Sequence, residues 1–480
     1  MNMQYETVIG LEVHTELSTK SKIFCACSTR FGQTPNTQVC PVCSGMPGAL
    51  PVLNRAVVEY AIRTGLAVNC NITRNNQFDR KNYFYPDLPK AYQISQLYFP
   101  ICTDGTLAIT SEDGGTKEVR IREIHMEEDA GKLIHDDWED ASFTDFNRCG
   151  VPLLEIVSQP DLRGVAETLD FLEKLKGILQ FCGVSDCKMQ EGSFRCDVNL
   201  SVRPMGSETY GTRTELKNMN STRAIARMIE AETARQIALL EEGGHVTQET
   251  RRWDDDAGES YPMRGKEDAQ DYKYFPEPDL PPLVISQEQI DAIQANMPEL
   301  PEAKKLRYTR ELGLPAYDTG IITSSVYLVR LFETTVEICG DAKESANWIM
   351  GEVLSRLKST QTLPENMPFA PESLGKIIVM AQKNIINRGT AKKVFAQVFA
   401  EDTDPEAYVK QNNLAMLTDA NAVREALIGV VEANQKSVNE FKNGKTQAFQ
   451  FLVGQGMKSL RGQASAQEVT RVLRELLGSD

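Results

Sequence analysis

One segment near the start of the chain, residues 6–17, limits the possible folds more than any other. Apolar and polar residues alternate along it, so a strand would place two sets of side chains on opposite faces: Ile9, Leu11 and Val13 on one, and Glu12, His14 and Glu16 on the other. The apolar set predicts a face packed on a core. On the other face, two carboxylates beside an imidazole repel each other unless a cation balances them, so the segment predicts either a divalent-cation site or a solvated surface.

The length of the chain predicts several domains. A chain of 480 residues is too long for one ordinary core, and about 150 residues per domain gives about three. No apolar run approaches the roughly 20 residues of a membrane span, and the start lacks a signal-peptide pattern. We therefore expect a cytoplasmic protein with no membrane partner. Eleven cysteines, an odd number, fit reduced thiols better than a disulfide framework.

The charge of the chain excludes a protein that coats nucleic acid indiscriminately. The net charge is −15, whereas phosphate binding needs an excess of Lys and Arg. A local excess does occur in the last forty residues, which hold Lys442, Lys445, Lys458, Arg461, Arg471 and Arg474. One end of the molecule is therefore suited to a polyanion.

The pattern of residues predicts three regions. Strands expected over 118–124, 151–157 and 195–202, together with a helix over 167–181, indicate a mixed α and β region. A proline-rich stretch at 275–283 marks a boundary near residue 290, after which the pattern is helical. Residues 401–405 predict a joint before a last small helical unit. The predicted domains are 1–290, 291–405 and 406–480.

Four cysteines give the strongest local signal. Cys25 and Cys27 form one close pair, and after twelve residues Cys40 and Cys43 form another. Two pairs of thiolates at this spacing favour a tetrahedral zinc site, which with four protein ligands would stabilise a loop and leave no open position for chemistry. The alternative is four buried thiols without a metal.

Two later acidic segments could complete a site begun by Glu12 and His14. Three successive carboxylates follow His125, and Glu155 interrupts an apolar strand. A buried carboxylate needs a base or a metal because an unpaired buried charge is very costly. For Glu155 the alternative to a metal is a salt bridge, with three candidate partners: Arg120, Arg122 or Arg148.

The usual motifs of phosphate binding and acyl transfer are missing. No Gly-x-Gly-x-x-Gly opens a helix, Gly444-Lys-Thr446 lacks the upstream glycine of a P-loop, and no nucleophile elbow occurs. The remaining possibility is Mg²⁺ bound by carboxylates that clamps ATP phosphates, with Arg80 and Lys81 among the bases that balance charge.

Further polar residues indicate the floor and wall of such a site. Alternation places Arg195, Asp197 and Asn199 on one strand face, and Glu215 and Lys217 on another before a helix capped by Asn220 or Ser221. Segments 79–89 and 271–281 resemble each other and combine bases, aromatic residues and prolines, which suits a nucleotide. Solvated faces and proline-rich connectors are the alternatives.

Several long motifs together resemble one family, the B subunit of aspartyl/glutamyl-tRNA amidotransferase, over the full length of the chain. The motifs are Thr7–His14, Phe78–Asp87, His125–Lys132, Asp271–Pro278 and Phe451–Gln455. The resemblance implies an α+β fold: an antiparallel-sheet cradle domain related to glutamine synthetase and guanidino kinases, then an all-α domain and a small helical tail.

The resemblance also implies an activity. Members of this family use ATP and Mg²⁺ to phosphorylate the side-chain carboxylate of Glu-tRNA(Gln) or Asp-tRNA(Asn). Ammonia from the glutaminase A subunit then displaces the phosphate, and a small C subunit holds the other two together. The chain is thus expected to be part of a carbon–nitrogen ligase with glutamine as amido donor, and its tail is expected to touch tRNA.

Site residues follow from the matching positions. The expected catalytic residues and Mg²⁺ ligands are Glu12, His14, Glu128 and Glu155; the choice of Glu128 over Glu127 comes from the resemblance, because alternation past His125 does not decide it. The expected nucleotide contacts are Arg80, Lys81, Tyr83, Arg195, Lys217 and Lys273. The zinc cysteines are present in some members only, which fits a structural role.

Two competing hypotheses differ from this one in class or mechanism. One is a zinc-stabilised scaffold that binds tRNA and leaves all catalysis to a partner, so it would need no ATP. The other is a self-contained ATP-dependent ligase that uses free ammonia, which the lack of a recognisable glutaminase motif permits.

Overall fold

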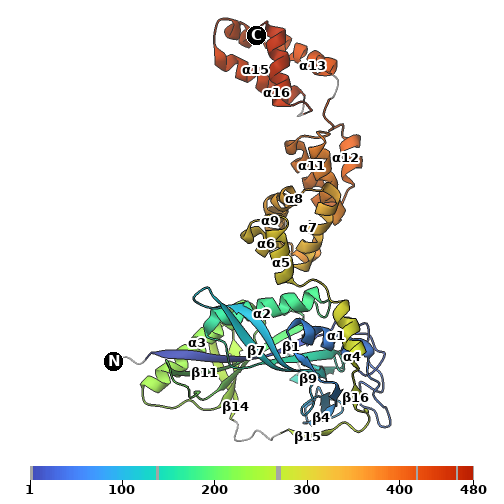
Figure 1. Ribbon diagram of the computed structural model, residues 1–480, viewed down its shortest axis with the longest axis vertical. Helices are drawn as coiled ribbons and strands as arrows, with labels where there is room; N and C mark the ends of the chain where they lie inside the picture. The colour runs from blue at the N-terminus through green and yellow to red at the C-terminus, as the bar shows by residue number, and fades with distance from the viewer. Residues whose placement is uncertain (1–3, 137–139, 266–271, 418–419, 461–462, 479–480) are drawn as a thin grey trace. The chain divides into compact units, whose positions relative to one another are not determined.

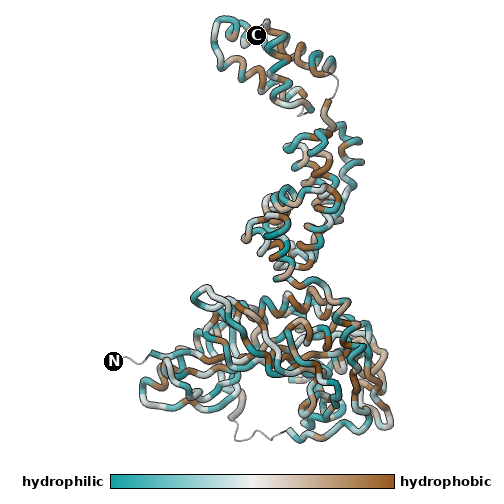
Figure 2. The backbone as a smooth tube through the Cα atoms, viewed as in Figure 1, coloured by the Kyte–Doolittle hydropathy of each residue, from teal (hydrophilic) through white to brown (hydrophobic). Residues whose placement is uncertain are grey.

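The computed structural model describes residues 4–136, 140–265, 272–417, 420–460 and 463–478, so Asp271 and Arg461 lie outside the described residues. The chain forms two compact units, Met1–Leu300 and Pro301–Asp480 (Figure 1). Along both units, hydrophobic and hydrophilic residues are interspersed within single strands and helices, as amphipathic elements require (Figure 2). No helix in the described ranges is long and apolar enough to cross a membrane.

The first unit is built on a large sheet that carries the candidate site. Its nine described strands follow the order β14-β13-β12-β11-β1-β10-β7-β6-β2. Neighbouring strands are antiparallel except β12 and β13, which are parallel. The bounds, in sheet order, are Glu259–Gly265, Glu249–Asp254, Thr214–Lys217, Phe194–Pro204, Tyr5–Glu16, Pro152–Ser158, Thr116–Glu128, Cys102–Thr110 and Asn71–Ile72.

One face of this sheet packs on the core. Ile9, Leu11 and Val13 of β1 are almost fully buried, as the alternation predicts. They belong to one apolar cluster with residues of three helices, α1 (Arg55–Ala67), α2 (Gly164–Phe181) and α3 (Thr222–Glu241). Figure 1 shows α2 and α3 on the same side of the sheet. This one-sided cover leaves the opposite face available for polar residues.

The predicted elements of this unit are present, with β7 and β11 longer at both ends, α2 longer at its start and β10 shifted by one residue. The strands expected over 118–124, 151–157 and 195–202 are β7, β10 and β11, and the helix expected over 167–181 is α2. The side chain of Ser221 accepts a hydrogen bond from the amide of Ala224, so Ser221 caps α3 as one of the two predicted candidates. A fourth helix, α4 (Gln287–Ala295), packs against α1.

Three small sheets complete the unit. In one of them, β4 lies between β15 and β5 and pairs with both in antiparallel fashion. The segments 79–89 and 271–281, which resemble each other in sequence, are therefore neighbours in this sheet through β4 and β15. Lys81 therefore lies opposite Tyr274, and Arg80 opposite Phe275. The strands of the small sheets are β15 (Lys273–Pro276), β4 (Asp79–Asn82), β5 (Tyr92–Ser95), β16 (Leu283–Val284), β3 (Asn75–Asn76), β8 (Lys132–Asp136) and β9 (Ala141–Asp145).

The second unit is helical throughout the ranges that the structure describes. Its elements are α5 (Pro301–Arg310), α6 (Ala316–Thr323), α7 (Val326–Cys339), α8 (Ala342–Trp348), the π-helix η2 (Ile349–Val353), α9 (Leu354–Thr360), the 3-10 helix η3 (Pro364–Asn366), α10 (Pro371–Gln382), α11 (Arg388–Glu401), α12 (Pro405–Gln411), α13 (Ala420–Ala433), α14 (Gln435–Lys442), α15 (Thr446–Ser459) and α16 (Ala466–Leu477). The last four helices share an apolar cluster of their own, which includes Leu427, Leu452 and Leu473. The observed class is α+β, with a sheet that is mainly antiparallel.

Candidate functional site

The polar face of the large sheet gathers the predicted acids and bases through strand register. His14 on β1 lies directly opposite Glu155 on β10 and Arg195 on β11, and Glu12 lies opposite Asp197. Because directly opposed residues share a face, five strands contribute polar side chains to one surface.

A first cluster on this face has the geometry of a cation site. Ligand atoms of His14, Glu127 and Glu155 lie within 4.8 Å of one another. The Nε2 atom of His14 is 3.5 Å from Oε1 of Glu127 and 4.0 Å from Oε1 of Glu155. Two carboxylates and an imidazole around one point form a donor set that suits a divalent ion.

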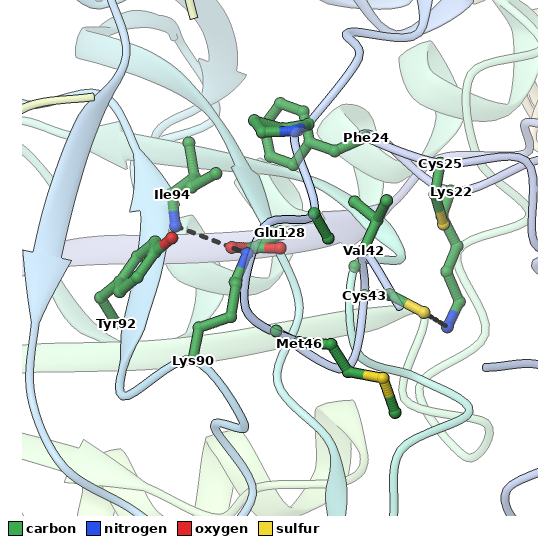
Figure 3. A pocket seen from close by; sticks show the side chains of 14 residues that line it. Lys22, Phe24, Cys25, Val42, Cys43, Met46, Lys90, Tyr92, Ile94 and Glu128 are labelled. Atoms are coloured by element: carbon green, nitrogen blue, oxygen red, sulfur yellow. Dashed lines mark hydrogen bonds and ion pairs between the residues drawn. The ribbon is translucent and has the colours of Figure 1, made fainter. Parts of the chain in front are cut away.

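The structure places Glu127, and not the predicted ligand Glu128, beside His14. Alternation continues to the end of β7, so adjacent residues point to opposite faces; Glu127 lies opposite Leu153 and Glu128 opposite Pro152. Glu128 instead accepts a 2.9 Å hydrogen bond from the amide of Ile94 and forms an ion pair with Lys90 (Figure 3). The resemblance favoured Glu128 as the residue beside His14, whereas the strand register puts Glu127 in that position.

Glu12 belongs to a second acidic cluster. Ligand atoms of Glu12, Asp197 and Glu215 lie within 4.8 Å of one another. One base balances part of their charge: Nζ of Lys217 is 2.6 Å from Asp197 and 3.0 Å from Glu215. The amide of Asn199 donates to Oε1 of Glu12 at 2.9 Å. The two clusters share one sheet face, since Glu12 and His14 are two residues apart on β1.

Burial disfavours charge in the first cluster. Burial, and then the negative charge of its acidic neighbours, raises the pKa of Glu127 and of Glu155 to about 7. Burial, followed by the nearby positive charge of Arg195, lowers the pKa of His14 to about 3, so this imidazole is neutral and has a lone pair to donate. A bound cation would favour the ionised form of both carboxyl groups and so lower their pKa values. The three residues therefore fit a divalent ion.

The alternative of an arginine salt bridge to Glu155 is wrong. The guanidinium groups of Arg120, Arg122 and Arg148 pair with Asp161, Glu123 and Asp129 respectively. The basic side chains with a nitrogen within 4.0 Å of the Glu155 carboxylate, among the described residues, are two histidines: Nε2 of His14 at 4.0 Å and Nδ1 of His125 at 3.8 Å.

Lys81 links the small sheet to the first cluster. Its Nζ atom lies 5.0 Å from the ring centre of Tyr272 and 5.9 Å from that of Tyr83. The ring centres of these two tyrosines are 5.2 Å apart. Burial opposes the charge of Lys81, but Glu127 and other neighbours outweigh this effect and raise its pKa. Lys81 is thus a charged base beside an aromatic pair, an arrangement suited to a nucleotide.

Two predicted nucleotide contacts lie on the other side of this strand pair. The register places Arg80 opposite Phe275 and Lys273 opposite Asn82, one residue out of phase with Lys81. The guanidinium group of Arg80 already has acidic partners, because it donates to Glu277 at 2.7 and 2.9 Å and to Asp279 at 3.0 Å. The structure therefore brings Lys81 and Tyr83 together and does not bring Arg80 or Lys273 to them.

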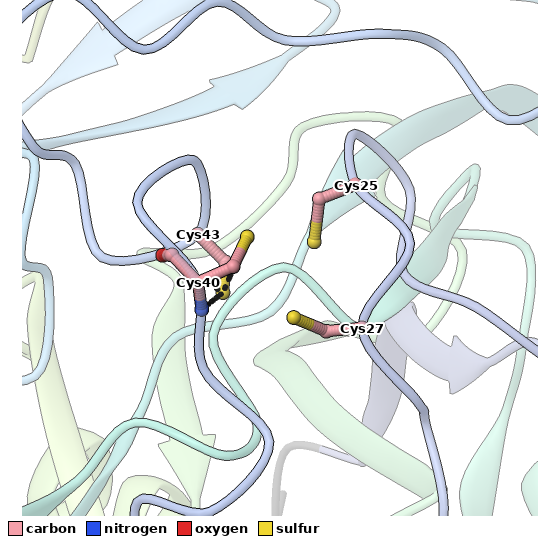
Figure 4. Close-up of side chains that lie close together, drawn as sticks. All are labelled: Cys25, Cys27, Cys40 and Cys43. Atoms are coloured by element: carbon pink, nitrogen blue, oxygen red, sulfur yellow. Dashed lines mark hydrogen bonds between the residues drawn. The ribbon is translucent and has the colours of Figure 1, made fainter.

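The four predicted zinc ligands converge (Figure 4). The sulfur atoms of Cys25, Cys27, Cys40 and Cys43 lie within 4.8 Å of one another. The amide of Cys40 and the fully buried Nζ of Lys22 contact Sγ of Cys43 at 3.2 and 3.5 Å. A hydrogen bond from Cys25 lowers the pKa of Cys43 to about 4. Three of the cysteines are only half-buried, which argues against inert core thiols and fits a tetrahedral metal site.

A small cavity lies between the cysteine loop and the Glu128–Lys90 pair (Figure 3). Its volume is about 100 Å³, and its wall includes Lys22, Phe24, Cys43 and Met46. Glu128 lines this cavity and points away from the sheet face that holds Glu127 and His14. The cavity is therefore not on that face.

Comparison with known proteins decides the family. Residues 7–291 match the family described as "GatB/GatE catalytic domain", and residues 330–477 match that described as "GatB domain". The chain belongs to the GatB family. It is 56% identical over 473 residues to the B subunit of the aspartyl/glutamyl-tRNA(Asn/Gln) amidotransferase of Lachnoclostridium phytofermentans, an alignment that covers 98% of this chain and 99% of the relative.

Other GatB relatives are similar over the same span. Proteins with the same name are 55% identical in Caldicellulosiruptor bescii over 478 residues and 50% identical in Chlorobaculum tepidum over 475 residues. Each alignment covers 99% of this chain, and 99% and 100% of the respective relatives. The resemblance inferred from the motifs is therefore confirmed.

Sequence reasoning assigned no specific role to three residues of this GatB chain. Glu127 and Asp129 were counted only among the three carboxylates after His125 that could complete the site, and Lys90 was not considered; all three make close contacts to predicted site residues or their neighbours. Alternation along β7 puts Glu127 on the face of His125, but the sequence alone does not show that this strand continues to Glu128. The pairing of Lys90 with Glu128 and of Asp129 with Arg195 had no local signal, since 38 and 66 residues separate the partners.

Proposed function

We propose that this chain is the B subunit of an aspartyl/glutamyl-tRNA amidotransferase and carries its kinase step. Membership of the GatB family supports the overall activity. The observation that carries the chemical proposal is the pair of acidic clusters on one sheet face, with a neutral His14 between carboxylates and Lys81 beside them. Such a face suits a reaction in which phosphate charge must be neutralised and positioned.

The first step we propose is phosphorylation of the side-chain carboxylate of the tRNA-bound Glu or Asp. A carboxylate resists ammonia because oxide is a poor leaving group. Transfer of the γ-phosphoryl group of ATP to a carboxylate oxygen gives an acyl phosphate and ADP, and attack by ammonia then releases phosphate and a proton and leaves the amide. The acyl phosphate would hydrolyse in open water, so the site must exclude solvent.

Three residues are proposed to hold Mg²⁺: His14, Glu127 and Glu155. Glu12 is proposed to act with the other two residues of the second cluster, Asp197 and Glu215. These three would bind either a second cation or the metal ion that is bound to ATP. When bound, Mg²⁺ supplies Lewis-acid stabilisation of phosphate charge. Lys81, Arg195 and Lys217 supply fixed positive charge on the same face, and Tyr83 with Tyr272 provides a stacking surface. Arg80 and Lys273 have no part in this proposal.

The remaining expectations belong to the same proposal. The sheet unit would form the cradle domain related to glutamine synthetase and guanidino kinases, within a division into 1–290, 291–405 and 406–480. Cys25, Cys27, Cys40 and Cys43 would hold a structural Zn²⁺. The partners would be the glutaminase A subunit, the C subunit and a misacylated tRNA that touches the tail, all in the cytoplasm.

The decisive experiment measures ADP formation by the chain reconstituted with its A and C partners in Mg²⁺. Glu-tRNA(Gln) and Asp-tRNA(Asn) are compared with the uncharged tRNAs. The proposal requires ADP that depends on the aminoacylated tRNA. Binding of tRNA without ADP formation would instead support the scaffold hypothesis. Full amidation by the isolated chain with ammonium salts would support the self-contained ligase.

A further inference from the structure

Asp129, directly after β7, holds one of the proposed nucleotide contacts in place. Its Oδ2 atom accepts a 2.8 Å hydrogen bond from Nη2 of Arg195 on β11, and both β1 and β10 lie between β11 and β7 in the sheet. Arg195 lies directly opposite His14, so this contact fixes a guanidinium group at the edge of the first acidic cluster.

Asp129 is itself held by several contacts. Its backbone amide donates to Val151 at 2.8 Å, its carbonyl accepts from Gly150 at 3.0 Å, and its Oδ1 atom accepts from the amide of Ala130 at 2.8 Å. The side chain is 4% exposed. With Oδ1 occupied, Oδ2 faces Arg195 and, at 3.5 Å, Arg148, and the carboxylate also shares a hydrogen bond with the side chain of Glu16. Contacts other than the one to Arg195 therefore help to fix the position of the carboxylate.

Two of the three guanidinium nitrogens of Arg195, Nε and Nη1, donate no hydrogen bond within the described residues. Its Nε–H is buried and meets no acceptor among the residues that the structure describes. A buried donor without a partner is costly, and most such groups bind water or a ligand. The guanidinium group belongs to the residue directly opposite His14, so an anionic oxygen is the acceptor that this positively charged group favours.

From these contacts we propose that Asp129 is a positioning residue that orients Arg195 so that the guanidinium group binds a phosphate oxygen of ATP. This inference rests on the proposed ATP-dependent function and adds a residue outside the cation ligands. Arg148 is not an equivalent partner, because its Nε and Nη2 atoms already donate to the carbonyls of Ala130 and Gly131 at 3.0 and 2.7 Å.

The test is equilibrium binding of ATP with Mg²⁺ to the reconstituted complex without tRNA, measured by calorimetry. Asp129→Asn keeps the shape of the side chain but presents an amide N–H to Arg195, so ATP affinity should fall about tenfold. In an Arg195→Gln background, the same substitution should change ATP affinity by less than about twofold. Such coupling is expected of positioning and not of a general loss of stability.

The matched control is Asp161→Asn. Asp161 also holds an arginine from a neighbouring strand, Arg120, at 2.7 and 2.8 Å, but neither residue is part of the polar face described above. Its substitution should leave ATP affinity unchanged. Arg195→Lys provides a second test that keeps Asp129 and the charge intact; it removes the fork geometry and should also weaken ATP binding about tenfold.

The outcomes separate the two proposals. Wild-type complex that binds no ATP would overturn the proposed function and this inference with it. If the wild type binds ATP and Asp129→Asn has no effect, or has the same effect with and without Arg195, the positioning role is wrong while the proposed function stands. If Asp129→Asn fails to fold, unchanged ATP affinity in Arg195→Lys overturns the inference instead.

Discussion

His14 and Glu155 lie directly opposite each other on β1 and β10, with the Nε2 and Oε1 atoms 4.0 Å apart. They are 141 positions apart in the chain, and the antiparallel register brings them together. The Oε1 atom of Glu127, 3.5 Å from the same histidine, completes a three-residue cluster whose ligand atoms are close enough to hold a cation.

We expect Glu12→Gln or Glu155→Gln to lower ADP formation by at least about 100-fold, because each removes a charge that would hold a cation against phosphate. The glutaminase activity of the partner should persist. The matched control is Glu118→Gln, an exposed carboxylate near the other end of β7, which should retain full activity. Full ATP-dependent amidation by the Glu12 or Glu155 variants would rule out the kinase assignment.

Two adjacent glutamates should behave differently. Glu127→Gln should raise the Mg²⁺ concentration needed for half-maximal ADP formation about 10–100-fold, since Glu127 faces His14. Glu128→Gln should leave that Mg²⁺ requirement unchanged and lower the free energy of unfolding by about 3 kcal/mol, because it leaves Lys90 without its buried partner. The reverse pattern in a Mg²⁺ titration and a denaturant melt would restore Glu128 as the ligand.

The first cluster predicts an unusual pH dependence. The pKa values of Glu127 and Glu155 rise from 4.5 to about 7 in the cation-free fold, so the native state binds more protons than the unfolded state between these values. Stability of the cation-free protein should therefore fall as pH rises from about 5 to 8. Mg²⁺ should bind more tightly at pH 8 than at pH 6 and should release protons.

Thermal melts at several pH values, with and without Mg²⁺, check this prediction. Added Mg²⁺ should remove the loss of stability at high pH, because the cation favours the ionised carboxylates. In Glu127→Gln combined with Glu155→Gln, the decline between pH 5 and 8 should be much smaller. A decline of the same size in this double variant would place its origin elsewhere in the chain.

The cysteine cluster should hold one metal ion per chain. Elemental analysis is expected to find Zn²⁺, and Cys27→Ser or Cys43→Ser should lose it and lower the melting temperature by several degrees. Cys339→Ser, a half-buried cysteine in α7 of the helical unit, is the control and should keep the metal. A metal-free protein with an unchanged melting temperature in all variants would show that the cysteines act as free thiols.

The sequence was sufficient where the signal is local. Alternation in β1 correctly separated the apolar set from Glu12, His14 and Glu16, because strand periodicity acts on neighbouring residues whatever the rest of the chain does. The cysteine pairs were recognisable for the same reason, since ligands a few residues apart constrain one loop. Motifs spread over the full length identified the family.

Tertiary structure decided which distant residues meet. The phase in which β7 joins β10 places Glu127, and not Glu128, on the face of His14, and the side chain of Arg80 pairs with Glu277 on the other side of β4 from Lys81. Tertiary structure also paired Asp129 with Arg195 across 66 positions. Sequence periodicity gives the faces of a strand but not its register with a neighbour, because register depends on the packing of the whole sheet on its core.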